Sequence, residues 1–243
     1  MSLRLFCVFA HPDDECFAFG GALALAADRG VEIYALCLTK GTAGSYRGNA
    51  KSDEELGHIR SEEFAASCKI LGIDRHELLD FQDGQLEHSP LATLVEPILK
   101  RMRSYQPHVV LTFGMDGAAN THADHTCVSA ATTAAFHWSG REKRFPALGA
   151  PFQPQRLFHH TTDFFLPGRP RPLPLPWTLK LDITSVFDRK AAAFFAHTTQ
   201  APLATTAVPL FERHGKYELY TLVASPKPHA ATQSTDMFEG VAK

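Results

Sequence analysis

The sequence predicts an α/β fold, with a mainly parallel sheet covered by helices on both faces. Hydrophobic patterns typical of strands and of helices alternate over about the first 115 residues. Apolar runs suited to buried strands lie at 3–9, 32–38, 76–81 and 108–113. Strands separated by helices favour parallel pairing, because each crossover helix returns the chain to the same edge of the sheet. The 243 residues are enough for one large core and contain no internal repeat.

Helix signals occupy the segments between these strands. Three helices are expected, over 17–29, from Ser52 or Asp53 to Leu71, and over 91–105. Gly30 and Gly72 supply the stops of the first two, because glycine readily adopts the conformation that ends a helix. Pro97 predicts a kink or a late start in the third. The Gly/Ser/Asn-rich residues 39–51 are expected to form a loop.

The second half of the chain is less regular. We expect a helix at 121–138, strands at 156–162 and 179–183, a helix at 186–196 and a last ordered element at 218–224. Residues 141–177 form a Pro-rich, insertion-like segment that cannot be helical. We therefore assign 1–224 to a single domain and expect the polar residues 225–243 to form a flexible C-terminal tail.

Composition and charge narrow the function classes. Lys and Arg number 24 and Asp and Glu 26, so no net field attracts the chain to nucleic acid or to an acidic membrane. The N-terminus does not resemble a secretory signal, and no run approaches the ~20 apolar residues that span a bilayer. The five cysteines contain no CxxC pair, which argues against a disulfide framework or a Cys-rich zinc site. We expect a cytoplasmic protein that acts on a small molecule.

Polar motifs follow the first and the fourth expected strand. The motif HPDDE occupies 11–15, and Asp116 and the motif HADH at 122–125 follow the strand at 108–113. In the common strand order 3-2-1-4, the loops after strands one and four meet where neighbouring crossovers leave in opposite directions. The fold and the chemistry therefore predict a site at the same place.

The residues of these motifs suit a hydrolytic zinc centre. Two imidazoles and one carboxylate, from His11, His125 and Asp14, could hold Zn²⁺ and leave room for water and a substrate carbonyl. Asp13 is then free to take a proton from the attacking water. His122 lies one helical turn before His125, so it could protonate a leaving amine or stabilise an oxyanion.

Together the motifs resemble those of the LmbE-like (PIG-L) family of zinc N-deacetylases. HPDDE matches the first family motif without a gap, and HADH matches the second with Ala123 in place of the commoner proline. Further matches are Arg60-x-x-Glu63, Leu71-Gly72, Asp83-Gly84 and Ala196-His197-x-x-Gln200. The resemblance implies a Rossmann-like sheet and removal of an acyl group from an N-acetylglucosamine-type substrate.

The resemblance also implies residue roles. By it, His11, Asp14 and His125 bind Zn²⁺, Asp13 is the general base and His122 is the acid or electrostatic residue. It places Arg60 and Asp83 in the sugar pocket, and it implies a homo-oligomer, a trimer or a hexamer. Some relatives carry a Tyr where this chain has Asn120, so that oxyanion role is absent here or filled by another group. The segment 141–177 is where we expect substrate choice to reside.

Several residues near the motifs have a plain structural interpretation. Glu15 is expected to be an acid in the first turn of a helix, with no further role. Asp124 either orients a ligand histidine or complements a helix dipole. His197 is expected to be a buried structural histidine, and of His159 and His160 at most one could reach the site, because neighbours in a strand point to opposite faces.

Two other functions remain open at this stage. A non-haem Fe(II) enzyme also uses two histidines and a carboxylate. A non-catalytic glycan-binding protein could retain the metal without the reaction. The second carboxylate, Asp13, favours hydrolysis over both. The sugar conjugate, the acyl group and the choice between Zn²⁺ and Fe²⁺ are not determined by the sequence.

Overall fold

A seven-stranded mixed sheet organises the protein, and the computed structural model describes residues 2–166, 168–226 and 232–242. Its strands are β1 (Arg4–Phe9), β2 (Glu32–Thr39), β3 (Arg75–Phe81), β4 (Val109–Phe113), β5 (Arg156–Thr161), β6 (Leu179–Asp182) and β7 (Tyr217–Ala224). Its helices are α1 (Asp14–Phe17), α2 (Gly20–Asp28), α3 (Asp53–Leu71), α4 (Leu91–Tyr105), α5 (Ala123–Ser139), α6 (Phe187–Phe195) and α7 (Ala204–His214). Short 3-10 turns include η2 (Ala118–Asn120) before α5 and η5 (Thr198–Leu203) between α6 and α7.

The strand order is β3-β2-β1-β4-β5-β7-β6. The strands β1 to β5 run parallel, and β7 pairs antiparallel with both β5 and β6. The mainly parallel α/β fold and the expected order 3-2-1-4 are therefore confirmed. β1 lies between β2 and β4, so the loops that leave β1 and β4 are neighbours at the carboxyl edge of the sheet.

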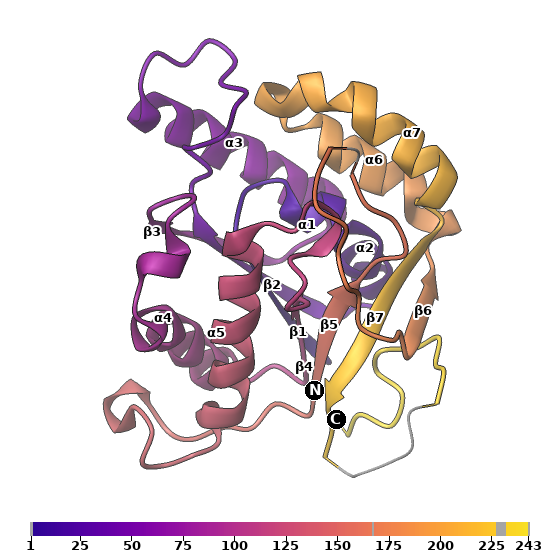
Figure 1. The fold of residues 1–243 in the computed structure, drawn as a ribbon. Coiled ribbons are helices and arrows are strands. Elements are labelled where there is room, and N and C mark those ends of the chain that lie inside the picture. The colour runs from indigo at the N-terminus through magenta and orange to yellow at the C-terminus, as the bar shows by residue number, and fades with distance from the viewer. Residues whose placement is uncertain (1, 167, 227–231, 243) are drawn as a thin grey trace.

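Helices cover both faces of the sheet (Figure 1). Along β1, Cys7 and Phe9 belong to a core beneath α2, α3 and α6, whereas Phe6 and Val8 belong to a second core beneath α4 and α5. This alternation follows from the period of two in a strand, which sends successive side chains to opposite faces. A strand buried on both faces needs apolar residues throughout, which explains the continuous apolar run at the start of the chain.

Local sequence signals predicted the positions of most helices and strands. Ser52 Oγ accepts the Glu55 N–H at 3.1 Å at the start of α3, and Gly72 ends this helix at φ 81°. The expected helix over 17–29 corresponds to α2, which begins at Gly20, and the separate turn α1 precedes it at Asp14–Phe17. The helix α7 was missed, because Pro202 and Pro209 masked its pattern; burial of its apolar residues against the domain stabilises it.

The C-terminal residues differ from the expected flexible tail. Met237 and Phe238 are buried, and Ser234 forms a bridge with Leu179 of β6. Arg29 on the end of α2 forms an ion pair with Asp236 at 2.6 Å. Residues 232–242 thus pack against the domain, because they contribute apolar side chains that the polar composition of the segment concealed. The part of this expectation that concerns 227–231 and 243 lies outside the described residues. Among the described helices, none is long and apolar enough to cross a bilayer.

Replacement of Phe238 tests this packing. Phe238→Ala should lower the free energy of unfolding by about 3 kcal/mol, because it removes a buried ring and leaves a cavity. Urea denaturation measures the change. Leu173→Ala, at a side chain that is 89% exposed, is the matched control and should leave stability within about 0.5 kcal/mol of the parent. An equally small effect of Phe238→Ala would mean that this segment does not pack in solution.

Candidate active site

The site lies at the carboxyl edge of the sheet, where β1 and β4 end. His11 follows β1, and His122 and His125 lie at the start of α5, which follows β4. The ring centroids of His11 are 4.7 Å from His122 and 5.3 Å from His125. The tertiary structure thus brings together the two motifs, which are more than a hundred residues apart in the sequence.

A tight turn connects β1 to α1. Asp13 has φ 108°, a conformation that residues other than glycine rarely adopt. The Asp14 carboxylate accepts the backbone N–H groups of His11 at 2.8 Å and of Ala10 at 3.2 Å. The Glu15 carboxylate accepts the N–H of Asp13 at 2.9 Å. Neighbouring side chains therefore hold the turn in its strained shape and aim Asp13 and Asp14 in different directions.

Three buried side chains could hold a metal ion. His11, Asp14 and His125 each offer a ligand atom, and these atoms lie within 4.8 Å of one another. Asp14 Oδ1 is 3.1 Å from His125 Nε2, and Asp14 Oδ2 is 3.5 Å from His11 Nδ1. His125 Nε2 is buried and makes no hydrogen bond to any described residue. A buried ring nitrogen that makes no hydrogen bond and faces a carboxylate oxygen fits a metal ligand, as does the mixed nitrogen and oxygen donor set.

The other ring nitrogens have acceptors that set the tautomers. His125 Nδ1 is 3.1 Å from the Gly117 carbonyl, which can only accept, so Nδ1 carries the proton and the Nε2 lone pair stays free. His11 Nε2 is 3.0 Å from Asp83 Oδ1 and 3.2 Å from Asp124 Oδ2. The proton on Nε2 leaves Nδ1 of His11 facing Asp14. Both rings therefore present a lone pair to the same point, as metal-binding histidines do.

Asp124 connects the two halves of the site. Its carboxylate accepts the backbone N–H of Gly84 at 2.7 Å and of Leu86 at 3.1 Å, in addition to its contact with His11. Burial raises the pKa of Asp124, but the hydrogen bonds from His11 and Gly84 outweigh it, so the pKa is lowered and the group stays ionised. Of the two interpretations of Asp124, these contacts favour the one in which it orients a histidine.

Asp13 lies beside the three side chains that could hold a metal ion. Arg60 on α3 donates from Nη2 to Asp13 Oδ2 at 2.9 Å. Burial raises the pKa of the Asp13 carboxyl to about 6, although the Arg60 guanidinium opposes this rise. A carboxylate that gains and loses a proton near neutral pH suits general base catalysis.

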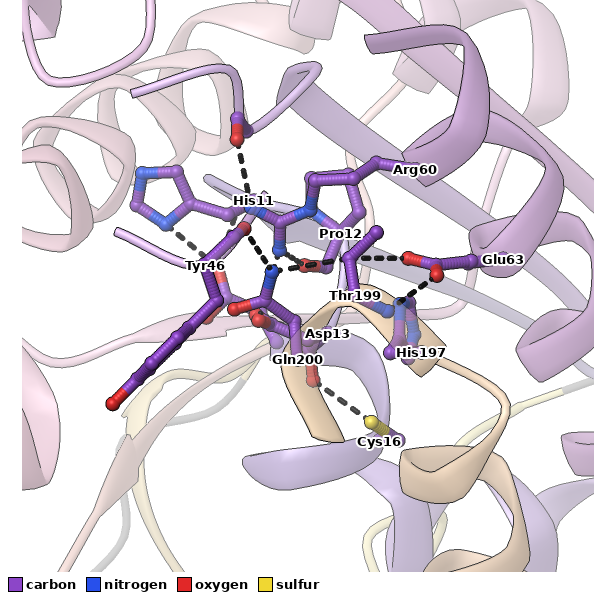
Figure 2. Close-up of polar contacts among 12 residues, drawn as sticks. His11, Pro12, Asp13, Cys16, Tyr46, Arg60, Glu63, His197, Thr199 and Gln200 are labelled. Carbon is purple, nitrogen blue, oxygen red and sulfur yellow. Dashed lines mark hydrogen bonds and ion pairs between the residues drawn. The ribbon is translucent and has the colours of Figure 1, made fainter. Parts of the chain in front are cut away.

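The two residues expected in a sugar pocket both line the cavity, and both also support the site. Arg60 reaches the carbonyls of Gly41, at 2.8 Å, and of Pro12, so its guanidinium holds the Asp13 turn against the 41–46 loop (Figure 2). Asp83 accepts the Ala43 N–H at 2.7 Å and contacts His11. Their hydrogen-bonding capacity is thus partly used within the protein.

His122 begins α5. Its Nδ1 accepts the Asp124 N–H at 3.1 Å, so in the neutral ring Nε2 carries the proton. Burial lowers the pKa of His122, and nearby His11 and His125 lower it further. A neutral ring with its N–H available can donate to a developing oxyanion. Asn120, also in the cavity wall, has a buried Oδ1 without a hydrogen-bond partner among the described residues.

Sequence reasoning missed the importance of Glu15. It is completely buried and accepts from Ser67 Oγ at 2.5 Å and from His197 Nε2 at 2.6 Å, besides the Asp13 N–H. The expectation of a simple helix-dipole acid is therefore wrong, because no first-turn acid needs such partners. Burial lowers the pKa of His197, but Glu15 outweighs it, so the pKa is raised. The match of Ala196-His197-x-x-Gln200 to the family pattern was the one feature of the sequence that pointed to a role for His197 near the site.

A second buried acid anchors the segment that carries His197. Glu63 on α3 accepts from Thr198 Oγ1 at 2.6 Å and from the N–H and the hydroxyl of Thr199 at 2.6 and 2.7 Å. Gln200, the next residue, donates to the Tyr46 carbonyl at 3.2 Å (Figure 2). Arg60 and Glu63, one turn apart on α3, thus tie the Asp13 turn and η5 to the same helix.

The metal-site candidates, Asp13 and His122 open into a cavity of about 650 Å³. Its polar wall includes His11, Asp13, Asp14, Arg60, Asp83, His122 and His125, together with the 43–46 loop. A cavity of this size can enclose most of a small-molecule ligand.

Fold and site together define a metal-dependent enzyme built on a Rossmann-like sheet. The chain belongs to the PIG-L family: the model of that family, described as GlcNAc-PI de-N-acetylase, matches residues 6–136. The match includes both motifs, and it confirms the family to which the sequence is similar.

Relatives extend the match over nearly the whole chain. The 1D-myo-inositol 2-acetamido-2-deoxy-alpha-D-glucopyranoside deacetylase of Rhodococcus jostii is 28% identical, over 92% of this chain and 88% of the relative. Among solved structures, the conserved protein TT1542 from Thermus thermophilus has a TM-score of 0.71 and 28% identity, covering 94% of this chain and 96% of its own. The N,N'-diacetylchitobiose deacetylase from Pyrococcus horikoshii has the same fold, with a TM-score of 0.71, 21% identity and coverage of 91% and 84%.

Glu15→Gln tests the support beneath Asp13. The amide keeps one acceptor oxygen and places N–H donors at the other position, so at least one of the three hydrogen bonds is lost and we expect the free energy of unfolding to fall by about 1–3 kcal/mol. The turnover number should fall as well, because the Asp13 turn loses its anchor. Glu54→Gln, at an exposed position of α3, is the control for both measurements. Parent-like stability and turnover of Glu15→Gln would exclude this supporting role.

Proposed function

We propose that this enzyme is a zinc-dependent hydrolase that removes an acetyl group from the amide nitrogen of an N-acetylglucosamine-type substrate. One observation carries the proposal: His11, Asp14 and His125 converge on one point, and Asp13, a further carboxylate, lies beside them. The Rhodococcus relative, named as a deacetylase of a 2-acetamido-2-deoxy sugar, supports this substrate class.

The metal would be held by His11, Asp14 and His125. When bound, a zinc ion supplies Lewis acidity, which polarises the amide carbonyl and lowers the pKa of a water molecule towards ~7. Two nitrogens and one oxygen also suit Fe²⁺, but an additional carboxylate placed to accept a proton is what hydrolysis requires. Zinc is therefore the metal that we propose.

Asp13 performs the proton transfers in this mechanism. Its carboxylate takes a proton from water, and the hydroxide attacks the amide carbon. The Arg60 guanidinium holds Asp13 in place at 2.9 Å, so the base needs little reorientation. The protonated Asp13 can then pass its proton to the departing amine. A pKa near 6 is well matched to both directions of transfer.

His122 stabilises the developing negative charge on the carbonyl oxygen. Its lowered pKa keeps the ring neutral, and its free N–H can donate to the oxyanion. Because a neutral imidazole is a poor proton source for an amine, we assign delivery of the proton to Asp13 rather than to His122.

Arg60 and Asp83 lie on the polar side of the cavity and are proposed to face the sugar. Asp83 Oδ1 and Oδ2 can each accept a further hydrogen bond from a hydroxyl. Arg60 already serves Asp13, so its effect on binding cannot be separated from its effect on the base by substitution alone. The surrounding 141–177 segment contributes Thr161 to Phe164 and Trp177 to the same cavity and is proposed to influence substrate choice.

The free cysteines and the balanced charge support a reducing, cytoplasmic setting and a small-molecule substrate. We propose that the enzyme works there as a homo-oligomer, a trimer or a hexamer, which size-exclusion chromatography with light scattering can measure.

Asp13→Asn tests the base. The amide cannot accept the proton, so the turnover number should fall by about 10²–10⁴-fold while the metal stays bound. Release of fluorescamine-reactive amine from N-acetylglucosamine compounds measures the rate. Asp80→Asn, at an exposed aspartate of β3, is the matched control and should behave as the parent. Unchanged amine release from Asp13→Asn would show that the mechanism is wrong.

His125→Ala tests the metal site. Removal of one of three ligands should reduce the metal content after dialysis and abolish amine release. Elemental analysis of the purified protein measures bound zinc and iron, and His88→Ala, at an exposed histidine, serves as the control. Iron together with oxygen consumption would favour the Fe(II) alternative, and metal without any amine release would favour a glycan-binding protein.

A further inference from the structure

The cavity wall also includes a cluster of apolar side chains beside the Lys190–Glu218 ion pair. Six apolar side chains from α1, α6, η5 and α7 line it there, namely Phe17, Phe194, Leu203, Ala207, Leu210 and Phe211. We call this region the apolar lobe. No step of the proposed mechanism uses it.

Aromatic contacts build the wall of the apolar lobe. The ring centroid of Phe17 is 5.2 Å from that of Phe211 and 6.1 Å from that of Phe194, and the last two are 5.6 Å apart. Phe194 and Phe211 are buried, whereas Phe17 and Leu210 remain partly exposed and line the cavity. Apolar surface left open within a cavity gains free energy when an apolar ligand covers it.

The apolar lobe is continuous with the proposed reaction centre. The short helix α1 carries Asp14 at its first residue and Phe17 at its last, so one helical turn separates a proposed metal ligand from the wall. Phe113 lines the same cavity and stacks on His125 with ring centroids 3.9 Å apart. A substrate held at the reaction centre can therefore reach the apolar lobe with a directly attached group.

Another part of the cavity wall is polar. Arg60 and Asp83, which contact Asp13 and His11, line it, together with Gly44 to Tyr46. Sugar hydroxyls belong on this side, because moving them against aromatic rings without hydrogen bonds would cost free energy. The apolar lobe is thus left for a part of the substrate that is not sugar, and 650 Å³ is room for more than one N-acetyl sugar ring.

We propose that the apolar lobe binds an apolar substituent, an alkyl or aryl group, of the N-acyl sugar that the enzyme hydrolyses. This inference rests on the proposed deacetylation and names the substrate class more closely. The group can be carried on the anomeric oxygen or on the acyl carbon, because both are near the amide.

Two substrate series separate these sources. One is the methyl, butyl, hexyl and octyl glycosides of N-acetylglucosamine; the other is methyl glucosaminide with N-acetyl to N-octanoyl groups. With the metal-loaded enzyme and monomeric ligands, kcat/KM should rise by up to about fourfold per methylene in one series, the value for a fully buried methylene. The series that rises identifies where the substituent is carried. A flat response in both overturns the proposal.

Failure of the reaction itself is distinguishable from failure of the apolar lobe. If the methyl compound releases no amine, the proposed deacetylation is wrong. Calorimetric binding of the intact compounds of both series then decides the inference directly: tighter binding of the octyl glycoside or of the N-octanoyl compound would support it, and equal binding of the short and long members in both series would overturn it.

A charged residue introduced into the wall of the apolar lobe tests the same assignment by substitution. Leu210→Asp should bring the kcat/KM of the octyl compound to within about threefold of that of the methyl compound, because the octyl group must then remove a carboxylate from water. The same holds for the ratio of their affinities. Leu210→Ala should reduce the ratio in part, and thermal melting reports whether each variant folds. Thr205→Asp, at an exposed position of α7 outside the cavity, is the control and should retain the parent ratio. A parent ratio in folded Leu210→Asp contradicts the assignment.

Discussion

Where the chain leaves β1 it turns through Asp13 at φ 108°, and this strained residue sets the directions of the Asp13 and Asp14 carboxylates. Such a conformation costs of order 1–3 kcal/mol and persists only where the surroundings hold it. The carboxylates of Asp14 and Glu15 do so by accepting backbone N–H groups of the same turn. The turn points Asp14 at the two histidines and Asp13 at Arg60, so one backbone irregularity separates a proposed metal ligand from a proposed base.

The buried charges of the site form a linked set. A carboxylate removed from water must be paired or hydrogen-bonded, and each one here is: Asp124 holds His11, Glu15 holds His197, and Arg60 holds Asp13. These pairs use most of the available donors, which leaves His125 Nε2 without a hydrogen bond among the described residues. The divalent cation that we propose to bind there would supply this partner. The same pairs explain why Glu15 and Asp124, which touch no substrate in the proposed mechanism, are buried beside the catalytic groups.

The two halves of the chain divide the work of the cavity. The parallel strands β1 to β4 and their loops supply the acids and histidines, because loops at a switch point converge on one place. The second half adds α6, η5 and α7, whose side chains form the apolar lobe together with Phe17 of α1. The two parts are joined through Glu15 and His197, so the segment that precedes the apolar lobe also supports the Asp13 turn.

The sequence by itself determined the parallel half of the fold and singled out the candidate residues of the site. The strand and helix periods, the Ser52 cap and the Gly72 stop depend only on neighbouring residues. The motifs at 11–15 and 122–125 are recognisable from their histidines and aspartates alone. Only the tertiary structure decided what Glu15 does, where α7 lies and how residues 232–242 pack. The physical reason is that burial and long-range hydrogen bonds override local propensity: Glu15 has its role because Ser67 and His197 arrive from distant segments.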